Sequence, residues 1–290
     1  MCGIVGVIGE QQSFEIKEML EVTTHRGEDC QQFRSFDQFG SMGINRLSII
    51  DLERGDQPLF NEDGTIAVVC NGEIYNHNSI RKDLADNHDF QTGSDAEVIV
   101  HLYEEYGNDA VKFLDGMFAF ILFDLRKGKT LIGRDPLGIK PLSYREDNGT
   151  IYVASEVKAL VSHGTEGIRD IPPGCIWTKE KGIQQYYEPA LKTSRPDTAL
   201  CRSLLTYAVR KRMMSDVEVG TFLSGGIDSS IVTALAAKEK PDIKAFTVGM
   251  EGMPDMEMAK KVAEYLGIEH IVKTFTVDDM LELLPEAIYH

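Results

Sequence analysis

Cys2 could act as a nucleophile because of its position at the start of the chain. If Met1 is removed, as is expected before a small residue, Cys2 gains an α-amino group whose ordinary pKa is about 7.7–8.0. Such an amine can accept the thiol proton at neutral pH, so nucleophile and base would belong to one residue. The alternative is a buried cysteine that packs as a small apolar side chain.

A second reactive pattern, Ser-Gly-Gly-Ile-Asp-Ser-Ser, follows an apolar run and precedes a helix-like segment. The glycines allow a tight turn whose N–H groups can approach an anion at the positive end of the helix. The serines add hydroxyl donors, and the aspartate offers an oxygen ligand suited to Mg2+. The lysine of a Walker-type loop is absent, which disfavours ordinary kinase or GTPase chemistry. The alternative is a glycine-rich turn that binds nothing. The residues concerned are Ser224, Gly225, Gly226, Asp228, Ser229 and Ser230.

The strands that must position Cys2 are predicted from apolar alternation. Residues 3–9 predict a strand with Cys2 at its tip, and residues 41–59 and 66–77 predict strands that end in polar turns. A polar stretch with two prolines between Tyr187 and Thr198 predicts a linker.

Helices and strands alternate after this linker. The spacing predicts a βαβ arrangement, which binds nucleotides at the carboxyl ends of its strands. A stripe of apolar residues at helical spacing is expected to lie in the core: Leu200, Leu204, Leu205, Val209 and Met213. The predicted helices are residues 199–214, 229–239 and 255–266, and the predicted strands are residues 219–223, 243–250 and 270–276.

Length and charge exclude several classes of protein. The chain has 290 residues, of which 42% are hydrophobic, enough for two domains with buried cores. Its formal net charge of −16 disfavours binding to nucleic acid or to an anionic membrane surface. No signal peptide or membrane span is expected, and five scattered cysteines argue against a disulfide framework and a zinc site. We therefore predict a reducing, cytoplasmic location.

The first part of the chain resembles the class II glutamine amidotransferase domain over nearly all of residues 2–190. The resemblance implies an α+β N-terminal nucleophile fold, an αββα sandwich, in which glutamine is hydrolysed to glutamate and ammonia. Besides Cys2, the matching motifs are His25-Arg26-Gly27 and those within residues 41–59, 66–77, 92–97, 114–120, 133–142, 154–160 and 172–174.

The resemblance also implies the roles of individual residues. The Asn71 amide and the Gly72 N–H would stabilise the oxyanion formed when Cys2 attacks. Arg46 would hold the carboxylate of glutamine with its planar fork, and Glu73 and Asp95 would hold the ammonium group. The segment that follows Arg46 would complete the glutamine site: Leu47, Ser48, Ile49 and Ile50.

Taken singly, each of these residues is also compatible with an ordinary structural role. Arg46 could form a surface ion pair, Asn71-Gly72 could form a hairpin turn, and Asp95 could cap the helix that starts at Ala96. The cap is compatible with a role in binding glutamine.

The loop at residues 224–230 resembles the pyrophosphate loop of ATP-pyrophosphatases, and residues 199–290 resemble the start of the synthetase domain of glutamine-hydrolysing asparagine synthetases. This implies an α/β domain with a parallel sheet that uses ATP and Mg2+ to adenylate aspartate. Leu223 and Val248 would contact adenosine, and Asp228 would bind the metal. The domains are thus expected at residues 1–190 and 199–290.

The predicted reaction is glutamine-dependent asparagine synthesis, with glutamine, aspartate and ATP as substrates. Because family members continue beyond the point that matches His290, we expect the synthetase domain to be truncated. One alternative is a stand-alone glutaminase, or a subunit of a split amidotransferase whose C-terminal half is a separate chain. Another is a catalytically silent regulatory module. A homodimer also remains open.

Overall fold

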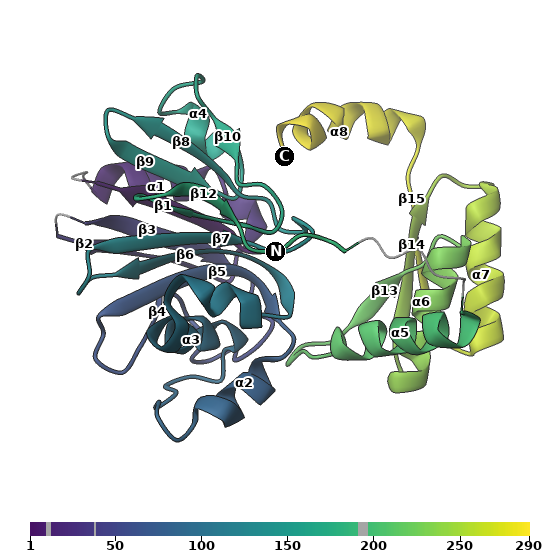
Figure 1. The fold of residues 1–290 in the computed structure, drawn as a ribbon. Helices are drawn as coiled ribbons and strands as arrows, with labels where there is room; N and C mark the ends of the chain where they lie inside the picture. Colours follow the sequence, from purple (N-terminus) through teal and green to yellow (C-terminus); the bar gives the residue numbers. More distant parts are fainter. Residues whose placement is uncertain (10–12, 38, 191–196) are drawn as a thin grey trace. The chain divides into compact units, whose positions relative to one another are not determined.

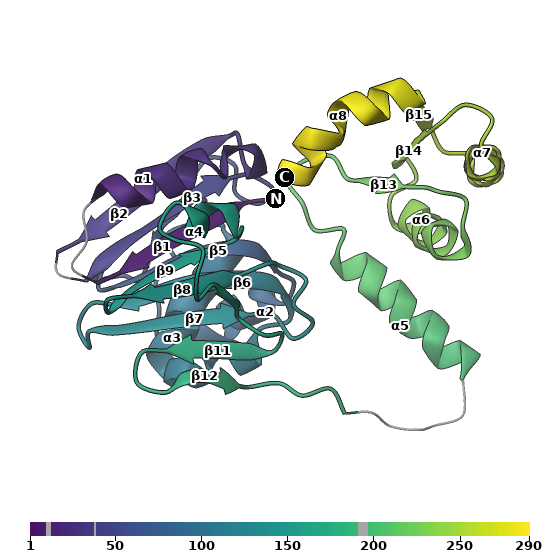
Figure 2. The ribbon, with the colours of Figure 1, turned by 90° about the horizontal axis from the view of Figure 1, so that it is seen from above.

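The computed structural model describes residues 1–9, 13–37, 39–190 and 197–290 (Figures 1 and 2). The chain forms two compact units, Met1–Lys192 and Thr193–His290. Part of the predicted linker, residues 191–196, lies outside the described residues.

The first unit contains two stacked six-stranded antiparallel sheets with helices on both outer faces (Figure 1). In strand order, one sheet consists of β10 (Arg169–Asp170), β8 (Ser143–Asp147), β9 (Thr150–Ala154), β1 (Gly3–Ile8), β3 (Gly40–Arg46) and β2 (Cys30–Phe36). The other consists of β12 (Gly182–Gln185), β11 (Cys175–Thr178), β7 (Lys129–Arg134), β6 (Gly116–Asp124), β5 (Ile66–Ile74) and β4 (Leu59–Phe60). The helices are α1 (Ser13–Glu21), η1 (Thr24–Arg26), α2 (His77–Leu84), η2 (Asp95–Glu97), α3 (Val98–Tyr106), η3 (Gly107–Phe113) and α4 (Lys158–Val161).

The two-residue periodicity of the strands explains the four layers. In β1, Ile4 and Ile8 pack between the sheets, whereas Val5 and Val7 pack in the cluster that contains α1 and α4. In β5, Ala67 and Val69 likewise face the inter-sheet core, while the alternate residues pack in the cluster that contains α2 and α3. Both sheets are therefore buried on both faces, and the predicted αββα sandwich is confirmed.

The second unit contains a three-stranded parallel sheet in the order β13 (Gly220–Phe222), β14 (Lys244–Gly249) and β15 (His270–Thr274). Helix α6 (Ile227–Glu239) connects the first two strands, and α7 (Pro254–Leu266) connects the second pair. Helices α5 (Thr198–Lys211) and α8 (Val277–Tyr289) precede and follow the sheet in sequence. The predicted order of helices and strands is confirmed.

The predicted buried stripe on α5 is wrong for three of its residues. Val209 is buried beside Ala236 and Ile243, and Met213 packs against them. Leu200, Leu204 and Leu205 are exposed. Helical spacing predicts which residues share a face of a helix, but the neighbouring elements decide how much of that face is covered.

Within the ranges given above, no helix combines the length and the apolar composition needed to cross a lipid bilayer. The cysteines, all of which lie in described residues, are free thiols.

Candidate active site

Cys2 directly precedes β1, and its side chain lies on the side of the strand that packs between the two sheets. Its side chain packs against the inter-sheet cluster that contains Ile4. The Leu47 N–H donates to Cys2 Sγ at 3.4 Å, and Sγ lies 3.6 Å from the Leu47 carbonyl oxygen. Burial raises the pKa of the Cys2 thiol, although the Leu47 hydrogen bond lowers it. The thiol is thus mainly protonated at neutral pH and needs a base before it can attack.

The terminal amino group lies one residue from this thiol. Met1 is 61% exposed, and burial of its amino group lowers the pKa of that amine. An amine with a lowered pKa is less protonated at neutral pH and can accept a proton. Removal of Met1 would transfer this role to the α-amino group of Cys2.

Arg26 fixes the main chain at Cys2, a role that was not predicted from the sequence. Its Nε donates to the Cys2 carbonyl at 3.0 Å, while its Nη1 lies 2.8 Å from Glu156 Oε1. His25 Nε2 and Lys158 Nζ also contact the Glu156 carboxylate, at 3.0 and 3.1 Å. The His-Arg-Gly motif and the motif around Glu156 were the available signals, since these segments, 130 residues apart, meet next to Cys2.

Asn71 and Gly72 lie inside β5, opposite Ala119 and Phe118 of β6, so the hairpin-turn alternative is wrong. Asn71 shares the inter-sheet face of Val69 because the residues are two apart. Asn71 is 1% exposed, and among the described residues its Nδ2 has no hydrogen-bond acceptor. A buried donor without a partner is unusual in a folded protein. A substrate oxygen would supply the missing acceptor.

The main-chain N–H of Gly72 points toward the open edge of β5. The Cys70 N–H donates to Gln57 Oε1 and the Ile74 N–H to Asp95 Oδ2, both at 2.6 Å, at the edge of β5 away from β6. Gly72 lies midway between them and has the same orientation, and within the described ranges its N–H meets no hydrogen-bond acceptor. A β-carbon at Gly72 would lie 2.2 Å from the Met117 carbonyl oxygen, so only glycine fits. Gln57 is a further residue that was not predicted.

Glu73 and Asp95 form an acidic pair. Burial, together with the charge of Asp95, raises the pKa of Glu73 to about 8, and burial raises that of Asp95 to about 6. Glu73 Oε2 is buried and has no hydrogen-bond donor among the described residues. Asp95 is not the N-cap that the sequence suggested, because it is the first residue of η2 and Ser94 occupies the cap position. The Asp95 carboxylate instead accepts a hydrogen bond from the Ile74 N–H. A cation placed at the pair would stabilise both carboxylates.

Arg46 is 4% exposed at the end of β3 and holds the loop that follows it. Its Nη1 lies 2.8 Å from Asp56 Oδ1, and its Nη2 donates to the carbonyl oxygens of Ile50 and Asp51 at 2.9 and 2.8 Å. The surface-pair alternative is wrong for the arginine, which is buried, although the Asp56 side chain is 42% exposed. The guanidinium therefore shapes residues 47–50, of which Leu47 is exposed and Ser48, Ile49 and Ile50 are half-buried.

In the second unit, the predicted nucleotide loop connects β13 to α6. Ser229 Oγ is hydrogen-bonded to Ser224 Oγ at 2.9 Å, accepts from the Ser224 N–H at 3.2 Å and donates to the Gly226 carbonyl at 3.2 Å. Gly225 has φ of 78°, and a β-carbon there would lie 2.6 Å from the Ala259 nitrogen. The serine contacts and the glycine conformation hold the loop around the N-terminus of α6, as an anion cradle requires.

The other predicted ATP residues surround this loop unequally. Asp228 is exposed in the first turn of α6, and Ser230, two residues later, is half-buried. Val248 is 59% exposed near the end of β14. Leu223, by contrast, is 1% exposed, and its N–H donates to the Phe246 carbonyl oxygen, so its side chain contributes to the core.

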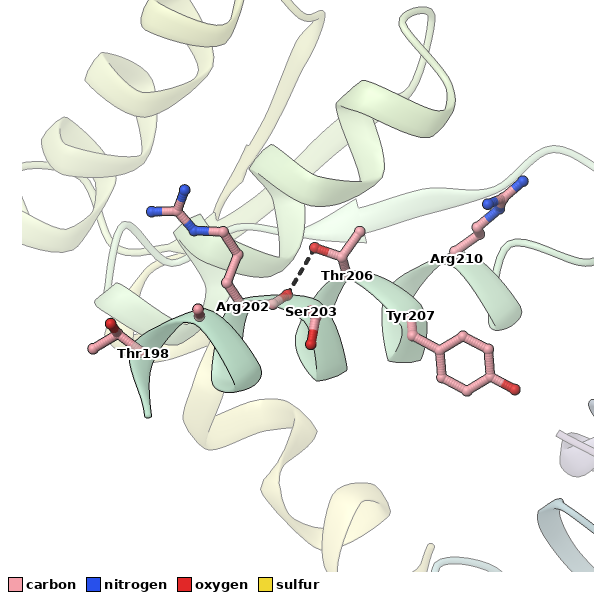
Figure 3. Close-up of a pocket in the computed structure, with 7 residues that line it drawn as sticks. Thr198, Arg202, Ser203, Thr206, Tyr207 and Arg210 are labelled. Carbon is pink, nitrogen blue, oxygen red and sulfur yellow. Dashed lines mark hydrogen bonds between the residues drawn. The ribbon is translucent and has the colours of Figure 1, made fainter. Parts of the chain in front are cut away.

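A separate groove runs along α5 (Figure 3). The residues that border it are not among those predicted to bind ATP: Thr198, Ala199, Arg202, Ser203, Thr206, Tyr207 and Arg210.

Two family models match the chain. The model described as "Glutamine amidotransferase domain" matches residues 1–190, and the model described as "Asparagine synthase" matches residues 200–290. Glutamine-hydrolysing asparagine synthetase 3 from Arabidopsis thaliana is 40% identical over 312 residues, which cover 100% of this chain and 54% of the relative. The asparagine synthetase of Asparagus officinalis is also 40% identical, over 316 residues that cover 52% of its length. The chain thus spans about half the length of these relatives.

Solved structures share the fold at lower sequence identity. The glutamine phosphoribosylpyrophosphate amidotransferase from B. subtilis aligns with a TM-score of 0.56 at 19% identity, covering 93% of this chain and 65% of that chain. A structure titled as the allosteric regulatory enzyme of purine biosynthesis gives the same TM-score and identity, covering 94% and 80%. At this identity the likeness supports the fold alone.

Proposed function

The chain belongs to the family of the glutamine amidotransferase domain, and from this premise we propose that it hydrolyses glutamine to glutamate and ammonia at Cys2. One observation carries the proposal: the buried Asn71 amide nitrogen has no acceptor among the described residues, and the neighbouring Gly72 N–H points to the open edge of β5. Two donors in this state suit an oxyanion, which appears only during the reaction.

The proposed reaction starts with proton transfer from the Cys2 thiol to the α-amino group exposed by removal of Met1. The thiolate attacks the side-chain amide carbon of glutamine, and the amide oxygen becomes an oxyanion held by Asn71 Nδ2 and the Gly72 N–H. The amine returns its proton to the departing nitrogen, which releases ammonia and leaves a thioester. Water then hydrolyses the thioester through a second oxyanion and restores the thiol.

Charged residues would select free glutamine. Glu73 and Asp95 would bind the ammonium group, which places a cation at this buried acidic pair. Arg46 would bind the carboxylate, and for this the exposed Asp56 must give up its contact with Arg46 Nη1. The segment formed by Leu47, Ser48, Ile49 and Ile50 would line the site, since Leu47 contacts Cys2.

Glutamate and ammonia production by the purified 290-residue chain tests this proposal. Mass spectrometry first establishes that Met1 has been removed. We expect Cys2→Ala to abolish glutamate release, whereas Cys201→Ala, which changes an exposed thiol in the second unit, should leave it intact. Hydrolysis that survives in Cys2→Ala, or an inactive processed wild-type chain, would contradict the assignment.

We further propose that the second unit binds MgATP and serves glutamine-dependent asparagine synthesis, in which ATP supplies an adenylate leaving group for the aspartate carboxylate. The loop would hold the phosphates through Ser224, Gly225, Gly226, Ser229 and Ser230, and Asp228 would bind Mg2+. Val248 would border the adenosine, and Leu223, whose side chain lies in the core, would contact it through its main chain. The exposure of Asp228 and the serine-braced loop support this assignment.

The aspartate site would be completed by residues equivalent to the part of the relatives that this chain does not span. These residues would belong to the same polypeptide or to a separate chain. Residues 1–190 are proposed as the glutaminase domain and residues 199–290 as part of the synthetase domain. The cytoplasmic location and a homodimer, which light scattering would test, remain predictions.

Nucleotide titration tests the second unit separately. We expect Asp228→Asn to weaken ATP binding in the presence of Mg2+ while glutamine hydrolysis is retained. Equal Mg2+-dependent binding by the variant and the wild type would refute the metal assignment.

A further inference from the structure

We propose that Glu62, His88, His101 and Glu104 form a binding site for a zinc ion in the first unit. The four residues come from three segments: the turn after β4, the connection between α2 and η2, and helix α3. They are distinct from the residues proposed for glutamine hydrolysis. The spacing of the cysteines could not reveal such a site, because its ligands are histidines and glutamates.

The distances between the ligand atoms fit a tetrahedral ion. His88 Nδ1 lies 3.1 Å from Glu62 Oε1 and 3.4 Å from Glu104 Oε2. His101 Nδ1 lies 3.6 Å from the same Glu62 oxygen and 3.4 Å from the same Glu104 oxygen. All four atoms lie within 4.8 Å of one another. A tetrahedral zinc ion with bonds of about 2.1 Å keeps its ligand atoms about 3.4 Å apart.

Unsatisfied buried atoms point independently to a missing ligand. The His101 side chain is fully buried at 0% exposure, yet neither of its ring nitrogens has a hydrogen-bond partner among the described residues. Glu104 Oε2, which faces His101 Nδ1, is also buried without a hydrogen-bond donor in the described part of the chain. Buried polar atoms in this state cost free energy, and one cation between them would satisfy both.

The surrounding residues resemble the outer shell of a metal site. His88 Nε2 lies 3.0 Å from Glu105 Oε1, which orients the ring so that Nδ1 faces the cluster. Asn61 Nδ2 donates to the second oxygen of Glu104 at 2.9 Å. Carboxylates and amides that hold the far side of metal ligands in this way fix the ligand geometry.

The charges around the cluster also favour a divalent cation. Four carboxylates lie within 4 Å of the two imidazole rings: Glu62, Glu97, Glu104 and Glu105. Two guanidinium groups face them, with Arg81 Nη2 at 3.2 Å from Glu97 and the half-exposed Arg126 Nη2 at 3.6 Å from Glu104. A zinc ion would neutralise the remaining negative charge without protonating either histidine.

The site would connect segments that also carry the proposed glutamine site. Glu97 accepts from the N–H groups of Gln91 and Thr92, and it lies two residues after Asp95. A metal ion at His101 would therefore fix the end of the loop that presents Asp95. The Glu62 side chain is 30% exposed, which provides access for the ion.

Zinc binding by the full chain, with any affinity tag removed and after treatment with a chelator, tests the proposal. We expect one Zn2+ per chain by elemental analysis, a raised Tm with zinc, and a tetrahedral absorption spectrum with Co2+. Glu62→Gln and His88→Gln should each weaken zinc binding by at least about 100-fold. Glu146→Gln and His163→Gln, elsewhere on the unit, should bind zinc as the wild type does.

Glu62→Gln keeps the side-chain volume at an exposed turn, so the variant is expected to fold, and circular dichroism verifies this. Wild-type protein that binds no stoichiometric zinc, or variants that both bind it as tightly as the controls, would overturn the proposal and identify the cluster as an ion-pair network. The readout is metal binding, so the result does not depend on whether glutamine is hydrolysed.

Discussion

Binding of glutamine should release a proton from the pair formed by Glu73 and Asp95 near neutral pH. Burial and the charge of Asp95 raise the pKa of Glu73 to about 8, and burial raises that of Asp95 to about 6. The free pair therefore holds about one proton at pH 7. An ammonium group placed between the two carboxylates favours the ionised form of both and expels that proton.

The magnitude follows from these pKa values. At pH 7 a carboxyl group with a pKa of about 8 is roughly nine-tenths protonated, so glutamine should release about 0.9 proton per site if the pKa falls well below 7 in the complex. At pH 9 Glu73 itself would release only about 0.1 proton, while the partly neutral amine of free glutamine would take up protons as it binds in the ammonium form. The ionised fraction of Glu73 rises about fivefold between pH 7 and pH 8, and the affinity for glutamine should rise by the same factor.

Isothermal titration calorimetry of the Cys2→Ala variant measures this release, because the variant binds glutamine without consuming it. Titrations at pH 7 in phosphate and in Tris give different apparent heats when protons pass to the buffer, and the difference yields their number.

The Glu73→Gln variant is the matched control, since an amide has no proton to lose in this range. It should bind glutamine more weakly, with equal heats in the two buffers. Asp95→Asn should reduce the release as well, because it removes a charge that raises the pKa of Glu73. Equal heats in both buffers for Cys2→Ala, together with an affinity that does not change between pH 7 and pH 8, would refute the reasoning.

Three other perturbations have defined outcomes. Asn71→Ala should lower kcat for glutamate release by about 10²–10³-fold. The Tm should change little, because the buried amide nitrogen has no hydrogen-bond partner among the described residues to lose. A large drop in Tm would indicate a structural role instead. Gly72→Ala should lower the free energy of unfolding, measured in urea, by about 1–3 kcal/mol. The reason is that the β-carbon of the new alanine would lie 2.2 Å from the Met117 carbonyl oxygen. Unchanged stability would show that β5 and β6 can separate to make room for it. Because the pKa of Glu73 is raised from 4.5 to about 8, the folded state binds more protons than the unfolded chain, and urea unfolding should show stability falling as pH rises through this range. Glu73→Gln should flatten that dependence, and an unchanged slope would exclude Glu73 as its source.

Much of the second unit could be predicted because its signals are local. The helix predicted at residues 255–266 corresponds to α7 (Pro254–Leu266), and the strand predicted at residues 243–250 corresponds to β14 (Lys244–Gly249). Glycines at 225 and 226 mark the turn between β13 and α6 for the same reason: backbone conformation depends mainly on neighbouring residues. The exposed leucines of α5 were not predictable, since their burial depends on other elements.

The first unit shows where local sequence misleads. Asn71-Gly72 is a common turn pair, yet it lies inside β5 because the residues around it pair with β6 across the sheet. Asp95 precedes a helical segment but accepts a hydrogen bond from Ile74, 21 residues away. The cluster of Glu62, His88 and their neighbours left no recognisable spacing, because its ligands come from separate segments.

By itself, the sequence determined the candidate nucleophile, the candidate nucleotide loop and the alternation that buries two sheets, because each depends on residue type or on spacing along the chain. Only the tertiary structure decided that Asn71 Nδ2 lacks an acceptor among the described residues, that burial and the charge of Asp95 raise the pKa of Glu73, and that Arg46 is held by its own loop. These properties depend on burial and on contacts between distant segments, which exist only once the chain has folded.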